Sequence, residues 1–232
     1  MPIAAQVKSP ILSGVVLRPE VQTVTFSVDS FKITNTRSRH EDTDYVSVTL
    51  LVRDANGNGT PQTQTKSMGN LNNGTFNVGL SFPNVVVPTN GSIVFNYLIV
   101  NSGHTSEGDI DKALEAVGGA LANKGLTAGG TALGTAILPG LGTILGAVAG
   151  WLAGEISGIL SANCDGPVAA EQVTLTYAQL MQKIATATDT VTTAHPGTDS
   201  ATGCGSNSMY YVTWHIAKGI EEPEPIKVVA HL

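Results

Sequence analysis

A stretch of 30 residues from Gly125 to Gly154 carries no charge, and from Gly142 to Gly158 glycine recurs at every fourth position. These glycines are Gly142, Gly146, Gly150, Gly154 and Gly158. Each glycine costs a helix interior about 1 kcal/mol relative to alanine, so a helix that keeps five must gain from the missing side chains. With 3.6 residues per turn, a spacing of four forms a slowly drifting stripe that a second backbone can approach closely. The stretch therefore predicts a glycine-zipper helix in contact with another helix.

The same region is long enough to enter a membrane. Residues 140–160 number 21, which make about 31 Å of helix against a bilayer core of about 30 Å. Residues 125–138, ahead of the helix-breaking Pro139-Gly140 pair, are too short to span alone. Over residues 125–162 the chain resembles the glycine-zipper helices of pore-forming toxins and membrane-active bacteriocins, which implies pore formation by self-association. The predicted insertion site comprises Gly130, Gly134, Gly142, Gly146, Gly150, Trp151, Gly154, Glu155 and Gly158.

Glu155 argues against a permanent membrane span, because a charged side chain costs about 2.5 to 3.5 kcal/mol at the centre of a membrane helix. We therefore expect a soluble fold that hides the helical hairpin and releases it at a target membrane. Protonation of Glu155 removes much of this cost, so acid should favour release. Two alternatives stay open, namely a hairpin that always packs against the rest of the fold and a standing membrane anchor.

Most of the remaining chain predicts antiparallel strands. Runs rich in Val, Ile, Thr, Phe and Tyr alternate between polar and apolar residues and are separated by turn residues. They span 21–28, 31–34, 44–52, 75–82, 92–100, 171–177 and 209–217. The Asn-Gly pairs that begin at Asn56, Asn73 and Asn90 fall between runs, where tight turns need positive φ angles. Short strands at this spacing predict an α+β fold, an antiparallel β-sandwich with an inserted Gly/Ala-rich helical hairpin.

The boundaries follow from the change in character. Residues 1–103 form the first part of the sandwich, 104–163 the inserted hairpin, and 164–232 the returning strands with a flexible tail from about 219. Ser106 is the expected N-cap of the first inserted helix. Residues 177–187 predict a further short helix with Leu180, Met181 and Ile184 facing inward. The apolar face of the first inserted helix is Ile110, Ala113, Leu114, Val117 and Leu121.

A charged loop lies between the second and third runs. Residues 37–44 hold five of the chain's 30 charged residues and one histidine. Three carboxylates this close repel one another unless arginine, solvent or a hard cation compensates, so Glu41, Asp42 and Asp44 are a candidate calcium site. The loop and following strand are similar to the acidic loop of C2-type sandwiches, and this resemblance implies calcium-dependent lipid docking. An arginine–carboxylate network that merely orders the loop is the alternative.

Composition excludes other functions. A net charge of −6 leaves no basic stripe for nucleic acid. Phosphate-binding glycine loops, zinc-binding histidine pairs and nucleophile elbows do not occur in the sequence, so we expect no enzyme.

Cys164 and Cys204 are a candidate disulfide, with two free thiols as the alternative. The amino terminus does not read as a secretory signal peptide, which predicts a soluble protein that is released non-classically or acts at a target-cell membrane.

The sequence thus predicts a cytolysin-like or bacteriocin-like protein whose partners are a lipid membrane and copies of itself. The alternative is a non-enzymatic soluble binding module, in which the 37–44 loop takes a cation, glycan or protein ligand and the helices serve as core. No cofactor other than calcium is expected.

Overall fold

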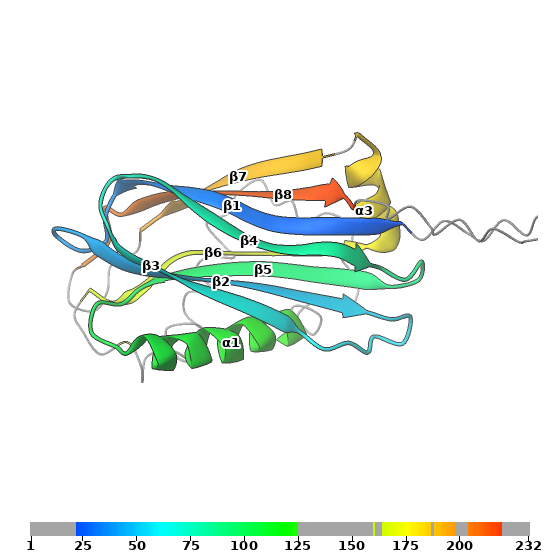
Figure 1. The fold of residues 1–232 in the computed structure, drawn as a ribbon, viewed down its shortest axis with the longest axis horizontal. Helices are drawn as coiled ribbons and strands as arrows, with labels where there is room; N and C mark the ends of the chain where they lie inside the picture. Colours follow the sequence, from blue (N-terminus) through cyan, green and yellow to red (C-terminus); the bar gives the residue numbers. More distant parts are fainter. Residues whose placement is uncertain (1–21, 125–159, 161–163, 187, 198–203, 220–232) are drawn as a thin grey trace, which may run out of the picture.

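The computed structural model describes residues 22–124, 160, 164–186, 188–197 and 204–219. Eight strands and two α-helices lie within these ranges (Figure 1). The strands are β1 (Thr23–Asn35), β2 (Asp42–Arg53), β3 (Gln62–Leu71), β4 (Gly74–Val86), β5 (Ser92–Asn101), β6 (Gly166–Thr176), β7 (Thr188–Pro196) and β8 (Met209–Lys218). The helices are α1 (Glu107–Lys124) and α3 (Tyr177–Lys183), which continues into a 3-10 turn, Ile184–Thr186.

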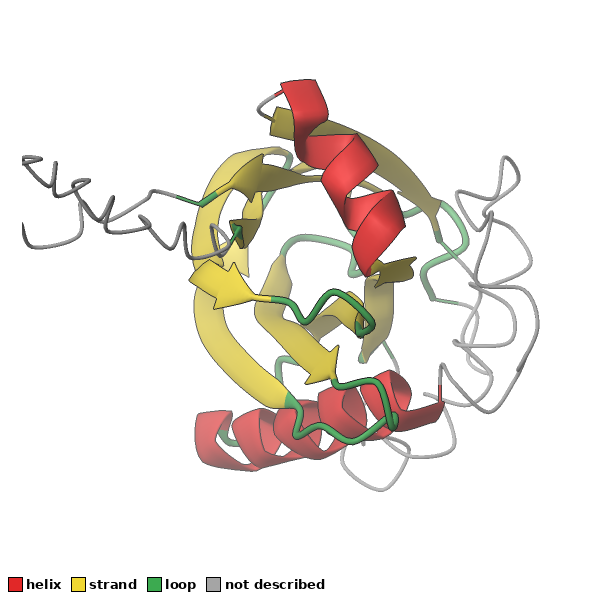
Figure 2. Ribbon diagram, turned by 90° about the vertical axis from the view of Figure 1, so that its right-hand side faces the viewer, coloured by secondary structure: helices red, strands yellow, loops and turns green. Residues whose placement is uncertain are grey.

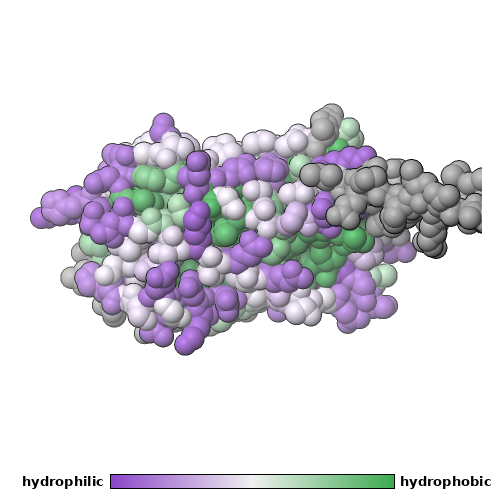
Figure 3. Space-filling model, viewed as in Figure 1, coloured by the Kyte–Doolittle hydropathy of each residue, from purple (hydrophilic) through white to green (hydrophobic). Residues whose placement is uncertain are grey.

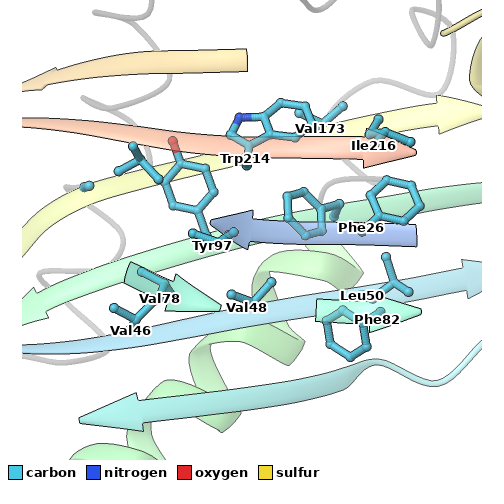
Figure 4. Packing of buried hydrophobic residues seen from close by; sticks show 14 of the residues in the cluster. Phe26, Val46, Val48, Leu50, Val78, Phe82, Tyr97, Val173, Trp214 and Ile216 are labelled. Atoms are coloured by element: carbon cyan, nitrogen blue, oxygen red, sulfur yellow. The ribbon is translucent and has the colours of Figure 1, made fainter. Parts of the chain in front are cut away.

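The strands form two four-stranded antiparallel sheets, in the orders β4-β1-β8-β7 and β3-β2-β5-β6. The sheets face each other across one hydrophobic core, to which both contribute. Aromatic rings join the layers, with the centroids of Phe26 and Phe95 5.3 Å apart and those of Phe95 and Trp214 5.5 Å apart. Figure 4 shows Phe26 and Trp214 in this core. The prediction of antiparallel strands around a shared core is confirmed, and we refer to this arrangement as the two-sheet body.

The strands differ from the prediction in two ways: two of the predicted strands form one continuous strand, and two observed strands, β3 and β7, were not predicted. The predicted runs 21–28 and 31–34 form the single strand β1, whose register with β4 shifts between Val28 and Ser30. β3 and β7 lie at sheet edges and are mostly polar and partly exposed, so they lack the runs of β-branched and aromatic residues from which the other strands were predicted. The Asn-Gly pairs at Asn56 and Asn90 fall between strands as predicted, and that at Asn73 ends on the first residue of β4, but only the pair at Asn56 joins two paired strands. The turns at Asn73 and Asn90 carry the chain from one sheet to the other.

Helix α1 covers the outer face of the sheet that contains β2 and β5 (Figure 2). It begins where expected, since the Ser106 hydroxyl accepts a hydrogen bond from the backbone N–H of Asp109. Its predicted apolar face is buried against Tyr45, Leu98, Val100 and Ala170. Because β5 has the core on one side and α1 on the other, nine of its ten residues are buried. The helical hairpin expected beyond α1 lies outside the described residues.

Helix α3, which falls within the short helix predicted at 177–187, lies across one end of the two-sheet body (Figure 2). Leu180 and Ile184 are buried in the core and Met181 packs against it. The helix starts with a capping box, in which the hydroxyl of Thr176 accepts from the N–H of Gln179 and the side chain of Gln179 accepts from the N–H of Thr176.

The edge strands β3 and β4 border one open side of the body. Lys66 Nζ donates to the carbonyl of Val78 at 2.6 Å and Gln64 donates to the carbonyl of Ser81, so side chains of β3 bind the unpaired edge of β4. Beyond these bonds lies a groove of about 470 Å³, lined by Leu50, Val52, Thr60, Gln62, Pro83, Val85 and Val86. Figure 3 shows hydrophobic surface on this face, between the ends of β4 and β2.

Candidate functional site

The predicted calcium loop, residues 37–44, folds inward at one end of the two-sheet body. Both oxygens of Asp42 accept backbone hydrogen bonds across the turn, from Arg37 N at 2.6 Å and Ser38 N at 2.7 Å. Tyr210, from the opposite sheet, donates its hydroxyl to Asp42 at 2.6 Å. Asp42 is therefore fully buried and fixes the conformation of the β1–β2 connection.

Asp44 lies beside Asp42 and shares its tyrosine, with 2.9 Å between its Oδ2 and the Tyr210 hydroxyl. The other oxygen of Asp44 is buried and has no hydrogen-bond partner among the described residues. Burial and the neighbouring charge of Asp42 raise the pKa of Asp44 well above its usual range, although the Tyr210 hydrogen bond opposes this. The protonated form of Asp44 fits this site, because it can donate to Tyr210 while Tyr210 donates to Asp42.

Arg37 connects this loop to Cys164, the residue that follows the predicted insert of residues 104–163. It is buried, and its Nε donates to the carbonyl of Cys164 at 2.8 Å. Gly166 and Gly205 flank its guanidinium group so closely that a Cβ at either position would lie within 2.8 Å of a guanidinium nitrogen. Cys164 and Cys204, which the sequence left open between a disulfide and free thiols, form a disulfide.

The two ends of the insert meet at this network. Asn101, where β5 ends, donates to the hydroxyl of Ser38 at 2.8 Å and to the carbonyl of Cys164 at 3.3 Å. Ser102 and Gly103, which lead into α1, both donate to the carboxylate of Asp165 at 3.2 Å. The chain therefore leaves and re-enters the two-sheet body at one place. We call this network, formed by Arg37, Ser38, Asp42, Asp44, Asn101, Asp165, Tyr210 and the disulfide, the insert clamp.

Only part of the predicted calcium site comes together. Asp42 and Asp44 are adjacent, whereas Glu41 is exposed and accepts a hydrogen bond from Asn70 at 2.7 Å. Within the described ranges, no group of three or more His, Cys, Asp or Glu side chains is placed to hold a metal ion. Calcium binding at these residues stays a prediction. The predicted insertion residues, Gly130, Gly134, Gly142, Gly146, Gly150, Trp151, Gly154, Glu155 and Gly158, lie outside the described residues.

A second polar cluster, which sequence reasoning missed, lies between the sheets at the facing edge strands β6 and β7. Glu171 Oε2 accepts hydrogen bonds from Tyr97, Thr193 and Trp214 at 2.7, 2.9 and 3.0 Å. The Tyr97 hydroxyl also lies 2.7 Å from Nε2 of the fully buried His195. The five residues come from β5, β6, β7 and β8, so spacing along the chain gave no indication of the cluster. The alternation of β7, which turns Thr193 and His195 inward, was the available signal.

Neither cluster presents a nucleophile with an adjacent base to an open cavity. Both oxygens of Asp42 are taken by backbone and tyrosine donors, Asp44 shares the same tyrosine, and Glu171 Oε2 accepts from three side-chain donors. In both clusters the polar side chains form hydrogen bonds between strands that are distant in the sequence. Comparisons with protein-family models, curated proteins and solved structures found no match to this chain.

Proposed function

We propose that this protein is a membrane-active, pore-forming protein in which the two-sheet body carries a glycine-zipper helical hairpin. The observation that supports the proposal is the insert clamp. Residues 101–103 and 164–165 are held side by side by hydrogen bonds, and the disulfide ties Cys164 to Cys204 near the start of β8, while the described strands supply two sheets and a shared core. A segment tethered in this way can change its surroundings while both of its attachment points stay in place.

The character of the tethered segment supports the same function. It contains the 30 uncharged residues from Gly125 to Gly154 and the five spaced glycines. Small residues at this spacing let helices associate in lipid through close van der Waals contact, where burial from water no longer drives packing. The described helices, α1 and α3, include no segment long and apolar enough to cross a bilayer. The proposal therefore assigns membrane entry to residues 125–160.

The alternative is a soluble, non-enzymatic binding module that uses the 37–44 loop. The burial of Asp42 and Asp44 leaves Arg39, His40 and Glu41 as the exposed side chains with which the loop could take a cation, glycan or protein ligand. Under this alternative, the helices would remain packed on the sheets throughout the life of the protein.

Release of a dye from liposomes tests the proposal. The wild-type protein should release the dye, and Gly150→Leu should abolish release by filling the zipper groove. Gly119→Ala on α1 is the matched control, because its added Cβ would meet only Pro61, at 3.7 Å, and should leave release intact. A folded Gly150→Leu variant with unchanged release would refute pore formation through the zipper.

A further inference from the structure

Outside the insert clamp, buried titratable side chains of the described residues also join the two sheets in the polar cluster at the facing edges of β6 and β7. We call it the His195 seam, formed by Tyr97, Glu171, Thr193, His195 and Trp214. Glu171 bridges the sheets directly, since it lies on β6 and accepts from Thr193 on β7 and Trp214 on β8. His195 extends the bridge, because it lies on β7 and bonds Tyr97 on β5.

The hydrogen bonds fix the neutral form of His195. Tyr97 donates its single proton to Glu171, so the imidazole Nε2 must donate to the Tyr97 oxygen. Nδ1 then carries a lone pair, and in the structure Nδ1 is buried without a hydrogen-bond partner among the described residues. A second proton would have to sit on Nδ1, where it would add a charge and a donor with no acceptor. Protonation therefore conflicts with the closed seam.

The groups around His195 do not offset this conflict. Glu171 on β6 is the anionic group of the seam, but it contacts His195 only through Tyr97. Tyr210 on β8 lies directly across the ladder from His195 and is already bonded to Asp42 and Asp44. The 3-10 turn packed against β7 has no titratable side chain, and Lys183 on α3 pairs with Asp189, six residues before His195.

We propose that His195 is an acid-sensitive lock, which holds β7 against Tyr97 of β5, and through Tyr97 against Glu171 of β6, while the imidazole is neutral and opens this edge when the imidazole takes up a proton. The lock acts on the site of the proposed function. β6 starts two residues after Cys164 of the insert clamp, and its Ala170 contributes, with Leu98 and Val100 of β5, to the surface under α1. Opening the seam loosens that surface. The link from the lock to membrane entry rests on the proposed function, whereas the lock itself does not.

The direction of the pH effect follows from burial. Desolvation lowers the pKa of His195 from 6.5 to about 4. The folded state thus binds fewer protons than the unfolded state below pH 6.5, so the stability is fully present above that pH and is lost as the pH falls towards 4. For one group with these values, the unfolding constant should rise by about 20-fold between pH 7 and pH 5.

Urea unfolding of the wild-type protein at pH 7 and pH 5 tests the lock against two variants. His195→Gln can retain a donor near Nε2 but cannot be protonated. The ratio of its unfolding constants at pH 5 and pH 7 should therefore be about 20-fold smaller than the same ratio for the wild type. His40→Gln removes an exposed histidine and should keep the full wild-type increase. An equal rise in wild type and His195→Gln would overturn the lock.

A second measurement on the wild type covers the case in which His195→Gln does not fold. Nitrogen chemical shifts of the histidine rings should show His195 neutral and protonated on Nε2 at pH 5. A His195 that is charged at that pH, or protonated on Nδ1 alone, would overturn the lock.

Dye release separates this inference from the proposed function. If the unfolding data show the lock but no dye is released at any pH, only the pore-forming role is refuted. If dye release is equal at pH 7 and pH 5 and His195→Gln unfolds like the wild type, only the lock is refuted.

Discussion

Substitution of Gly118 on α1 tests whether the helix is seated closely on the sheet or merely lies near it. A Cβ at this position would come within 2.2 Å of the Thr49 hydroxyl and 3.4 Å of its Cβ, and Thr49 is fully buried. The hydroxyl cannot turn away without loss, because it shares a 2.8 Å hydrogen bond with Thr63. Moving the helix outward would instead break the bond from Asn96 to the Gly118 carbonyl. Gly118→Ala must therefore disturb one of these two contacts.

The neighbouring glycine provides the control. Alanine in place of glycine stabilises a helix interior by about 1 kcal/mol at either position. Gly119→Ala should keep this gain, because its Cβ makes only an ordinary contact with Pro61. At Gly118 overpacking costs about 1 to 3 kcal/mol, so the free energy of unfolding should be about 1 to 3 kcal/mol lower for Gly118→Ala than for Gly119→Ala. Urea denaturation measures the difference. Equal stabilities for the two variants would mean that α1 is not held at this distance.

Three further perturbations have defined outcomes. Reduction of Cys164–Cys204, or Cys164→Ser, should lower the free energy of unfolding by about 4 kcal/mol, because the disulfide closes a loop with a sequence separation of 40; a melting temperature unaffected by reductant would contradict this. Asp44 has a raised pKa in the folded state, so its stabilisation is present at low pH and is lost as the pH rises above its unfolded value. Asp44→Asn should therefore gain stability relative to wild type between pH 5 and 8, and a loss in urea titrations would show that the ionised carboxylate is needed. If Asp42 and Asp44 instead hold calcium, chelation should lower the wild-type melting temperature and leave that of Asp44→Asn unchanged.

The sequence carried enough information for α1 and for the strands that are rich in Val, Ile, Phe and Tyr. β2, β4, β5, β6 and β8 all fall on predicted runs, and the residues of the α1 apolar face are buried as expected. Two polar edge strands were the weak point. β3 and β7 have one polar side and little core contact, so their Thr and Gln residues resemble those of loops. Their pairing partners are what make them strands.

The structure gives the charged residues of the 37–44 loop a different role from the predicted one, because Asp42 and Asp44 are buried. The density of charge at 37–44 indicated an exposed cation loop, yet Asp42 and Asp44 point inward to Tyr210, which is 166 residues beyond Asp44 in the sequence. Nothing in the local sequence shows that a tyrosine and two backbone N–H groups will satisfy these carboxylates. The His195 seam was hidden for the same reason, because its five side chains come from four strands. Long-range polar contacts of this kind follow from sheet order, which periodicity does not determine.

Deletion of the tethered segment tests most directly whether the two-sheet body carries a separable membrane-entering element. α1 has 18 residues, or about 27 Å of helix, so a 16-residue Gly/Ser linker in place of residues 125–159 is long enough to return the chain to the clamp. The proposed function predicts that this variant keeps the disulfide and a cooperative unfolding transition but releases no dye from liposomes that the wild type empties. Dye release equal to that of the wild type, or collapse of the two-sheet body on deletion, would contradict it.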